Sequence, residues 1–226
     1  MCGRFTLHSR DRIELKGFTA LDLPFEARYN IAPSQKVLAI ADFGKGAEGR
    51  MLTWGLIPSW SSDGKGGFIN ARAETLDEKP SFSESFRLRR CLIPADGFFE
   101  WKRTGREKAP FYIYAADETP LMFAGIWDMW RNRGEQLTSC AIITTPSNEM
   151  ITELHDRMPA ILPSEIQETW LDRRTNRAEL LRMLTPYPAS RMKTHPVSSR
   201  VNSTENDSAD LVFRVDTEVG QTLSLF

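Results

Sequence analysis

The second residue of the chain, Cys2 in the opening "MCGRF", raises the first chemical question. Removal of Met1 would leave its thiol beside a free α-amine, and both groups are partly reactive near neutral pH, with ordinary pKa values of about 8.5 and about 7.7–8.0. Such a 1,2-aminothiol condenses with an aldehyde, first as a Schiff base and then as a cyclic thiazolidine. It can also attack an amide, as N-terminal nucleophile hydrolases do. A lone cysteine, however, is more often an inert small hydrophobe.

Two polar connections hold further candidate residues. Residues 55–75 form a long Gly- and Ser-rich segment that contains Trp60 and Asn70, and residues 148–162 place His155 in polar sequence between apolar flanks. Binding and catalytic residues are concentrated on loops that a rigid scaffold positions. These two segments are therefore the candidate site loops.

Each candidate also has an ordinary structural interpretation. Asn70 and Arg72 could cap and cover a helix, and Trp60 could lie in the core. Glu100, in "FFEWK", could be the solvent-facing residue of an alternating strand, and His155 could be a loop histidine with a local partner. Periodicity alone does not decide between these interpretations and the functional ones.

The composition is that of an ordinary globular protein. With 226 residues, 41% of them apolar and 26% charged, the chain predicts one domain over residues 1–226 with a sizeable core. No segment has the apolar length needed to cross a bilayer, and the N-terminus carries acidic residues but no apolar stretch typical of a signal peptide, so we expect no membrane partner. The net charge of −1 gives no global electrostatic case for nucleic acid, and DNA binding would need a local basic surface.

The three cysteines, Cys2, Cys91 and Cys140, lie far apart, and their odd number argues against a disulfide framework. The histidines are not at metal-ligand spacing from them. The sequence thus predicts no metal, no cofactor and a reducing, cytoplasmic location. Cys91 and Cys140 lie inside apolar strand-like runs and are expected to be structural.

Strand-like runs dominate the elements that must position these residues. Residues 102–110 are typical of a charged hairpin turn with Gly105 at its tip, and helices are predicted over 9–18, 162–174 and 176–184. The sequence therefore predicts one α+β domain built mostly on antiparallel sheet. The predicted strands cover residues 3–7, 36–42, 50–57, 67–70, 91–95, 98–103, 110–116, 121–128 and 138–144.

Eight blocks of sequence resemble those of one known family, in the same order and over nearly the whole chain. The family is SRAP, named for SOS-response-associated peptidase. The resemblance implies a mixed α+β fold with a curved, barrel-like sheet and a few peripheral helices. The blocks are "MCGRF", "RYNIAPSQ", "WGLIPSW", "INARAET", "RRCLIPADGFFEWK", "MFAGIWD", "TTPSNEMITELHDRMPAIL" and "HPVSSRVN".

The resemblance also implies a function in the response to DNA damage. Family members bind abasic sites in single-stranded DNA and form a thiazolidine crosslink through the N-terminal cysteine, which makes them stoichiometric reagents rather than turnover enzymes. Carried over to this chain, Cys2 supplies the thiol and the α-amine, and Asn70 holds the N-terminus by hydrogen bonds. Glu100 moves protons during Schiff-base formation and reversal, and His155 helps to open the sugar ring.

The family's contacts to the DNA backbone map onto Arg4, Arg72 and Arg157, whose guanidinium forks suit phosphate oxygens. Thr144 is placed at the backbone near the lesion.

Two further residues match wedge positions that splay the strand and stack on bases. These are Pro33 in "RYNIAPSQ" and Trp60 in "IPSW". Some family members have a second aromatic residue directly after the loop tryptophan, whereas this chain has Ser61. The strength of the wedge is therefore in question, but the crosslinking chemistry is not.

Two other functions compete with abasic-site crosslinking. One is a cysteine-type peptidase with Cys2 as N-terminal nucleophile and His155 and Glu100 as proton relay. The other is a non-covalent single-stranded DNA binding module, for which Cys2 would be dispensable. Retention of Met1 would lock the α-amine in a peptide bond and prevent thiazolidine formation. We expect a monomer, cytoplasmic, and associated with the nucleoid if the source is bacterial.

Overall fold

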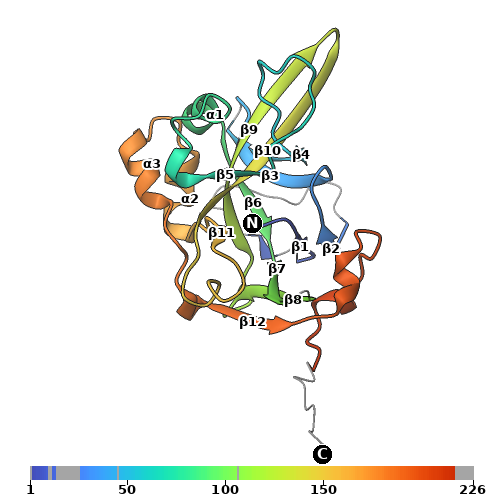
Figure 1. Cartoon of the computed structure of the whole chain (residues 1–226). Helices are drawn as coiled ribbons and strands as arrows, with labels where there is room; N and C mark the ends of the chain where they lie inside the picture. Colours follow the sequence, from blue (N-terminus) through green and yellow to red (C-terminus); the bar gives the residue numbers. More distant parts are fainter. Residues whose placement is uncertain (1, 10–11, 14–25, 45, 106, 217–226) are drawn as a thin grey trace, which may run out of the picture.

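A closed five-stranded barrel forms the centre of the computed structural model, which describes residues 2–9, 12–13, 26–44, 46–105 and 107–216 (Figure 1). The strands follow one another in the order β10–β4–β3–β6–β9, and the pairing of β9 with β10 closes the ring. Only the pairing of β10 with β4 is parallel within this described ring. The strands are β3 (Lys36–Asp42), β4 (Ala47–Trp54), β6 (Arg90–Ala95), β9 (Leu121–Asn132) and β10 (Glu135–Pro146).

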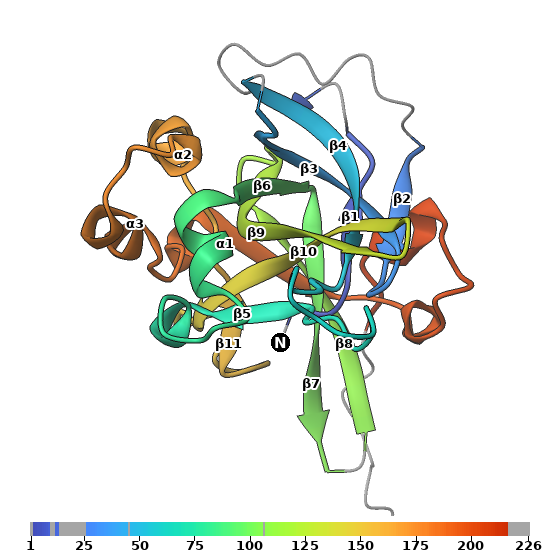
Figure 2. The same ribbon diagram turned by 90° about the horizontal axis from the view of Figure 1, so that it is seen from above.

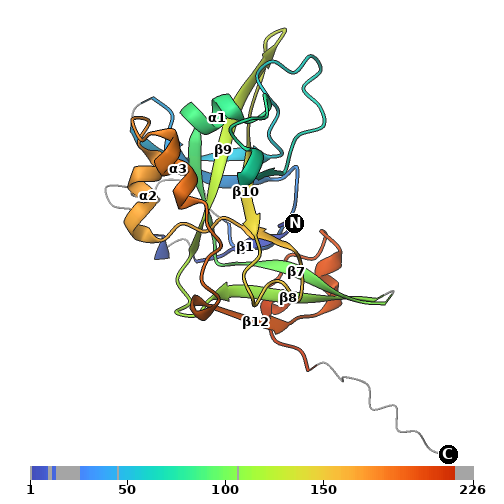
Figure 3. The same cartoon turned by 60° about the vertical axis from the view of Figure 1, so that its left-hand side comes forward.

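A second sheet, antiparallel throughout its described pairings, lies against the barrel in the order β12–β8–β7–β1–β2 (Figure 3). The two β-layers together confirm the expected α+β class with a mostly antiparallel, barrel-like sheet. The strands are β1 (Phe5–Leu7), β2 (Arg28–Ile31), β7 (Gly97–Thr104), β8 (Glu107–Ala115) and β12 (Met192–Pro196).

Aromatic side chains join the two layers. The ring of Phe5 on β1 meets Trp54 of the barrel edge-on at 5.2 Å and Phe123 at 6.0 Å, and Phe98 on β7 meets Phe123 at 5.9 Å. Edge-to-face pairs at these distances add about 0.5–1.5 kcal/mol each to the free energy of area burial. Because Phe5 is anchored in this way, the short segment before it, which carries Cys2, has a fixed starting point.

Strand β10 also pairs with two short strands outside the barrel. β5 (Asn70–Arg72) runs parallel to it and β11 (Arg157–Pro159) antiparallel, so Thr144 stands opposite both Arg72 and Pro159 (Figure 2). The two candidate site loops of the sequence therefore meet on one strand.

The helices lie together on one side of the barrel (Figures 1 and 3). They are α1 (Ser83–Leu88), α2 (Ser164–Leu171) and α3 (Arg177–Met183). The predicted helices at 162–174 and 176–184 are confirmed, and the Asn176 side chain caps α3 by accepting from the Glu179 N–H. The helix predicted over 9–18 falls mostly outside the described residues. Helix α1 is absent from the sequence-based prediction.

Several strands differ from the prediction in extent. The strand expected over 67–70 begins at Asn70, and Phe68 before it makes only an isolated bridge with Leu56. β2, β11 and β12 are too short or too polar to have been predicted. The predicted hairpin is confirmed, and Gly105 at its tip has a φ of 63°, in the left-handed region that favours glycine.

Candidate active site

Cys2 lies beside β7 because of the register of β1. Phe5 pairs with Phe98, and the Phe99 N–H donates to the Arg4 carbonyl at 3.0 Å, so the chain before Arg4 runs back toward Glu100. The Cys2 side chain is fully buried. Burial raises the pKa of its thiol well above the ordinary value, and the charge of Glu100 raises it further. The thiol is therefore protonated at neutral pH and needs a base before it can react.

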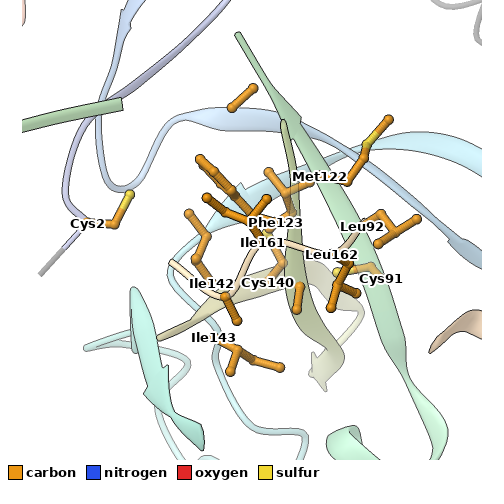
Figure 4. Close-up of a cluster of buried hydrophobic side chains, with 14 of the residues drawn as sticks. Cys2, Cys91, Leu92, Met122, Phe123, Cys140, Ile142, Ile143, Ile161 and Leu162 are labelled. Carbon is orange, nitrogen blue, oxygen red and sulfur yellow. The ribbon is translucent and has the colours of Figure 1, made fainter. Parts of the chain in front are cut away.

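The other two cysteines have a different environment. Cys91 and Cys140 lie among the aliphatic side chains of the barrel core, whereas Cys2 lies to one side of that cluster (Figure 4). Burial raises the pKa of Cys140 to about 12 and raises that of Cys91 as well. Both are buried in the barrel as expected of structural cysteines.

Asn70 connects β5 to the segment that carries Cys2. Its Nδ2 donates to the Cys2 carbonyl at 2.9 Å. Its Oδ1 is buried and has no hydrogen-bond partner among the described residues. A buried amide oxygen without a partner costs about 1–3 kcal/mol, so the site contains an acceptor that is ready for a donor close to Cys2.

Glu100 is 3% exposed on β7, and the interpretation as a solvent-facing strand residue is wrong. Alternation fails here because β7 is buried on both faces: Phe98 and Phe99 before it are also fully buried. Burial raises the pKa of the Glu100 carboxyl above its usual range, and the nearby charge of Asp156 adds to this effect. Glu100 can therefore hold a proton at a pH at which an exposed glutamate has lost it.

His155 follows a turn stabilised by its own N–H, which donates to the Ile151 carbonyl at 2.8 Å. Two neighbours compete for Nδ1. The Arg157 N–H donates to it at 2.9 Å, which requires an unprotonated Nδ1, whereas Asp156 Oδ1 lies 2.7 Å away and favours a protonated one. Desolvation lowers the pKa of the imidazole. At neutral pH this favours the neutral ring, with its proton on Nε2.

Arg4 and Arg157, expected to contact phosphates, both have partners within the protein. Arg4 Nη1 donates to Asn30 Oδ1 at 2.8 Å and to the Val201 carbonyl at 2.7 Å. Arg157 makes two hydrogen bonds to the Glu74 carboxylate, at 2.5 and 2.9 Å, and one to the Thr144 carbonyl at 2.5 Å. Only 11% of the Arg157 side chain is exposed.

The remaining candidates for DNA contact differ in exposure. Trp60 is 64% exposed, so the interpretation of Trp60 as a core residue is wrong. Arg72 is exposed at the end of β5, and Pro33 is half-buried in a turn closed by the Gln35 N–H, which donates to the Ala32 carbonyl at 3.3 Å. Thr144 is 1% exposed, and its carbonyl is one of the acceptors that hold Arg157.

Sequence reasoning missed two groups that organise this region. Glu74, in the "INARAET" block, pairs with an arginine 83 positions away, and no local signal marks such a pair. Asn30 is fully buried and donates to the carbonyls of Val201, Ser203 and Asn206. In the sequence, only its position between Tyr29 and Ile31 indicates that Asn30 could be a buried polar residue.

Within the described parts of the chain, no group of three or more His, Cys, Asp or Glu side chains is arranged to hold a metal ion. The described helices are all too short or too polar to span a membrane. Two cavities, of about 370 and about 870 Å³, are lined by other residues, around α1 and α3 and around residues 116–122. Asn70 and Glu100 both act on Cys2, and Asp156, whose charge acts on Glu100, lies next to His155 in the chain.

Comparison with known proteins agrees with the sequence blocks. The profile of the family described as SOS response associated peptidase (SRAP) matches residues 1–204. The chain is 42% identical over 222 residues to the abasic site processing protein YoaM of Bacillus subtilis, covering 94% of this chain and 97% of that protein. It is 32% identical to the abasic site processing protein YedK of Escherichia coli, covering 94% and 99%. A crystal structure of a protein from Bacteroides thetaiotaomicron superposes with a TM-score of 0.76 at 33% identity, covering 83% of this chain and 85% of that one.

Proposed function

Because the chain belongs to the SOS response associated peptidase (SRAP) family, we propose that it processes abasic sites in single-stranded DNA by forming a covalent thiazolidine crosslink through Cys2. The names of the two curated relatives support the choice of lesion. The observation that carries the proposal is the meeting of Cys2, Asn70 and Glu100, from three separate segments, at one buried point.

The chemistry balances with water as the sole by-product. Once Met1 has been removed, the Cys2 α-amine attacks the aldehyde carbon of the ring-opened deoxyribose, and loss of one water gives a Schiff base. The thiol then adds to the imine carbon while its proton passes to the nitrogen, which closes the thiazolidine ring. The product has the combined mass of protein and DNA less one water.

The raised pKa of the Cys2 thiol sets the order of the two bonds. A free α-amine, with an ordinary pKa of about 7.7–8.0, is partly neutral at pH 7.5, whereas the buried thiol stays protonated. The amine therefore attacks first. The thiol follows only when a base takes its proton.

Glu100 and His155 have the protonation states that these steps need. A Glu100 carboxyl with a raised pKa can give its proton to the departing water and, as carboxylate, take the proton of the thiol. A neutral His155 with its proton on Nε2 can donate a hydrogen bond to the ring oxygen of the sugar, which takes up the proton of the anomeric hydroxyl group as the ring opens. Burial of Glu100 keeps bulk water from competing at that carboxyl group.

Asn70 positions the nucleophile. Its Nδ2 fixes the Cys2 carbonyl at 2.9 Å, and its unpartnered Oδ1 is a suitable acceptor for the α-amine that appears when Met1 is removed. Since both new bonds form at one carbon, a defined orientation of the amine and thiol lowers the barrier by several kcal/mol.

The intact mass of the purified protein, before and after incubation with an abasic single-stranded oligonucleotide, tests the proposal. We expect loss of Met1 and then a shift equal to the oligonucleotide less one water, stable to denaturant. Cys2→Ala keeps an α-amine but has no thiol, so it should give only a Schiff base. That adduct should resist denaturation only after borohydride has reduced it to an amine. Loss of Met1 without any adduct in the wild type would contradict the proposal.

A further inference from the structure

The β9–β10 hairpin extends well beyond the barrel, and the connection between β4 and β5 lies along it (Figures 1 and 3). This connection carries Trp60, which exposes 64% of its surface. An exposed tryptophan on a long Gly- and Ser-rich connection would ordinarily sample many positions. Here the backbone on both sides of it is bound to the hairpin.

Three hairpin side chains bind the connection at alternate residues. Each of these three makes one hydrogen bond of 2.8 Å to a backbone group of the connection. Asn132 Nδ2 adds a longer one, of 3.4 Å, to the Ser62 carbonyl. Ser139 Oγ accepts from the Ile57 N–H, Asp128 Oδ2 accepts from the Ser59 N–H, and Trp130 Nε1 donates to the Ser61 carbonyl.

These three side chains form one row. Ser139 stands directly opposite Asp128 in the β9–β10 ladder, and Trp130 follows two residues after Asp128, which puts it on the same face. All three are at least 94% buried, although the hairpin projects from the barrel. The Arg89 guanidinium pairs with the Asp128 carboxylate, Nε to Oδ1, at 3.2 Å, which offsets the cost of burying that charge.

The connection then turns back beneath the Trp130 ring. Gly64 has a φ of 65°, and a Cβ at this position would lie 2.7 Å from the ring. Only glycine fits both the backbone conformation and the contact. Residues 57–64 are therefore attached through Ser139, Asp128 and Trp130, with Trp60 between two attachment points.

We propose that the hairpin is a rigid bracket in which Asp128 and Trp130 are positioning residues that hold Trp60 for stacking on an unstacked nucleobase. This inference rests on the proposed function, which supplies single-stranded DNA as the ligand. A preordered loop binds more tightly because it loses little conformational entropy on binding. The bracket also gives a reason why one exposed aromatic residue suffices where Ser61 follows it.

A double-mutant cycle tests the bracket on undamaged single-stranded DNA at fixed salt, with affinity measured by fluorescence anisotropy. Trp60→Ala should weaken binding about 5- to 140-fold, the range expected for one stacked base. Trp130→Phe keeps an aromatic ring but loses the indole N–H and part of the surface that packs on Gly64, and should weaken binding about 2- to 10-fold. In the Trp60→Ala background the same Trp130→Phe change should have no further effect.

Two more variants guard against a general loss of stability. Trp170→Phe also loses one indole hydrogen bond, to the Cys91 carbonyl at 3.0 Å, but in the core beneath α2, and should leave affinity unchanged. Gly64→Ala lies on the connection itself and should act like Trp130→Phe, including its dependence on Trp60. Additive effects of Trp130→Phe and Trp60→Ala would overturn the bracket.

The outcomes separate this inference from the proposed function. Unchanged affinity of Trp60→Ala, with crosslinking intact, would overturn the stacking role and leave the crosslinker standing. The expected cycle without any crosslink to abasic DNA would support the bracket and overturn the chemistry proposed for Cys2.

Discussion

Replacing Glu74 by glutamine should strengthen binding of single-stranded DNA and make it more sensitive to salt. In the structure the Arg157 guanidinium is bonded twice to the Glu74 carboxylate and once to the Thr144 carbonyl. The charge of Arg157 is thus neutralised, and both of its terminal nitrogens already donate hydrogen bonds within the protein. Glutamine at position 74 removes the negative charge and leaves at most one acceptor, so Arg157 becomes available to a phosphate.

The size of the effect follows from counterion release. Each phosphate neutralised on a single strand contributes about −0.7 to the slope of log K against log salt concentration. Freeing one guanidinium should therefore make the slope more negative by about 0.7. Glu74 is 47% exposed but Arg157 only 11%, so loss of their pair costs more folding stability than the about 0–1 kcal/mol of a pair exposed at both ends.

The assay is a titration of undamaged single-stranded DNA over a series of salt concentrations, read by fluorescence anisotropy. Arg157→Ala in the wild-type background should leave the slope unchanged, since that charge is already paired. Glu48→Gln frees Arg50 from a pair on β4 that is exposed at both ends, and serves as a control with no expected change in slope. An unchanged slope for Glu74→Gln, together with a shallower one for Arg157→Ala, would refute the reasoning, because Arg157 would then leave Glu74 for DNA in the wild type.

Three further predictions follow from the site and its supports. Asn70→Ala should slow crosslinking at least severalfold, measured as the first-order rate at saturating abasic DNA, while Cys2 thiol content stays the same; an unchanged rate would remove Asn70 from the site. The pKa of Glu100 in the folded state lies above its ordinary value of 4.5, so above that pH the folded state binds more protons than the unfolded state and loses stability as pH rises. The melting temperature of Glu100→Gln, which does not titrate, should therefore increase relative to that of the wild type from pH 4.5 upward. A constant difference between the two melting temperatures would contradict the raised pKa. Asn30→Ala should lower the free energy of unfolding in denaturant by about 1–3 kcal/mol, because it leaves buried groups unpaired, whereas Asn132→Ala on the exposed hairpin should cost little.

The long strands and two helices could be predicted because their signals are local. Residues 121–128 and 138–144 are apolar runs that form barrel strands, and 164–171 carries its own start signal at Pro163 and Ser164. β11 and β12 could not be predicted in the same way. Their three and five residues become strands only because β10 and β8 stand beside them.

The site divides along the same line. The positions of Cys2, Asn70, Glu100 and His155 came from ordered sequence blocks, but their geometry depends on tertiary contacts. The burial of Glu100 arises because β7 is covered on both faces, which alternation cannot reveal. Arg157 and Glu74 lie 83 positions apart in the chain. The sequence therefore predicts an arginine available for phosphate, whereas in the structure its guanidinium is hydrogen-bonded to Glu74.

The anchoring of Arg4 at the far end of the chain has a consequence for protein synthesis. Arg4 bonds to the carbonyls of Val201 and Asn202, so the segment that carries Cys2 gains these two contacts only after residue 202 has been synthesised. A ribosome adds about 5–20 residues per second, which separates the two ends by roughly 10–40 s. During that interval Arg4 lacks two of its hydrogen-bond acceptors, so the segment before β1 is among the last parts of the molecule to be fully anchored.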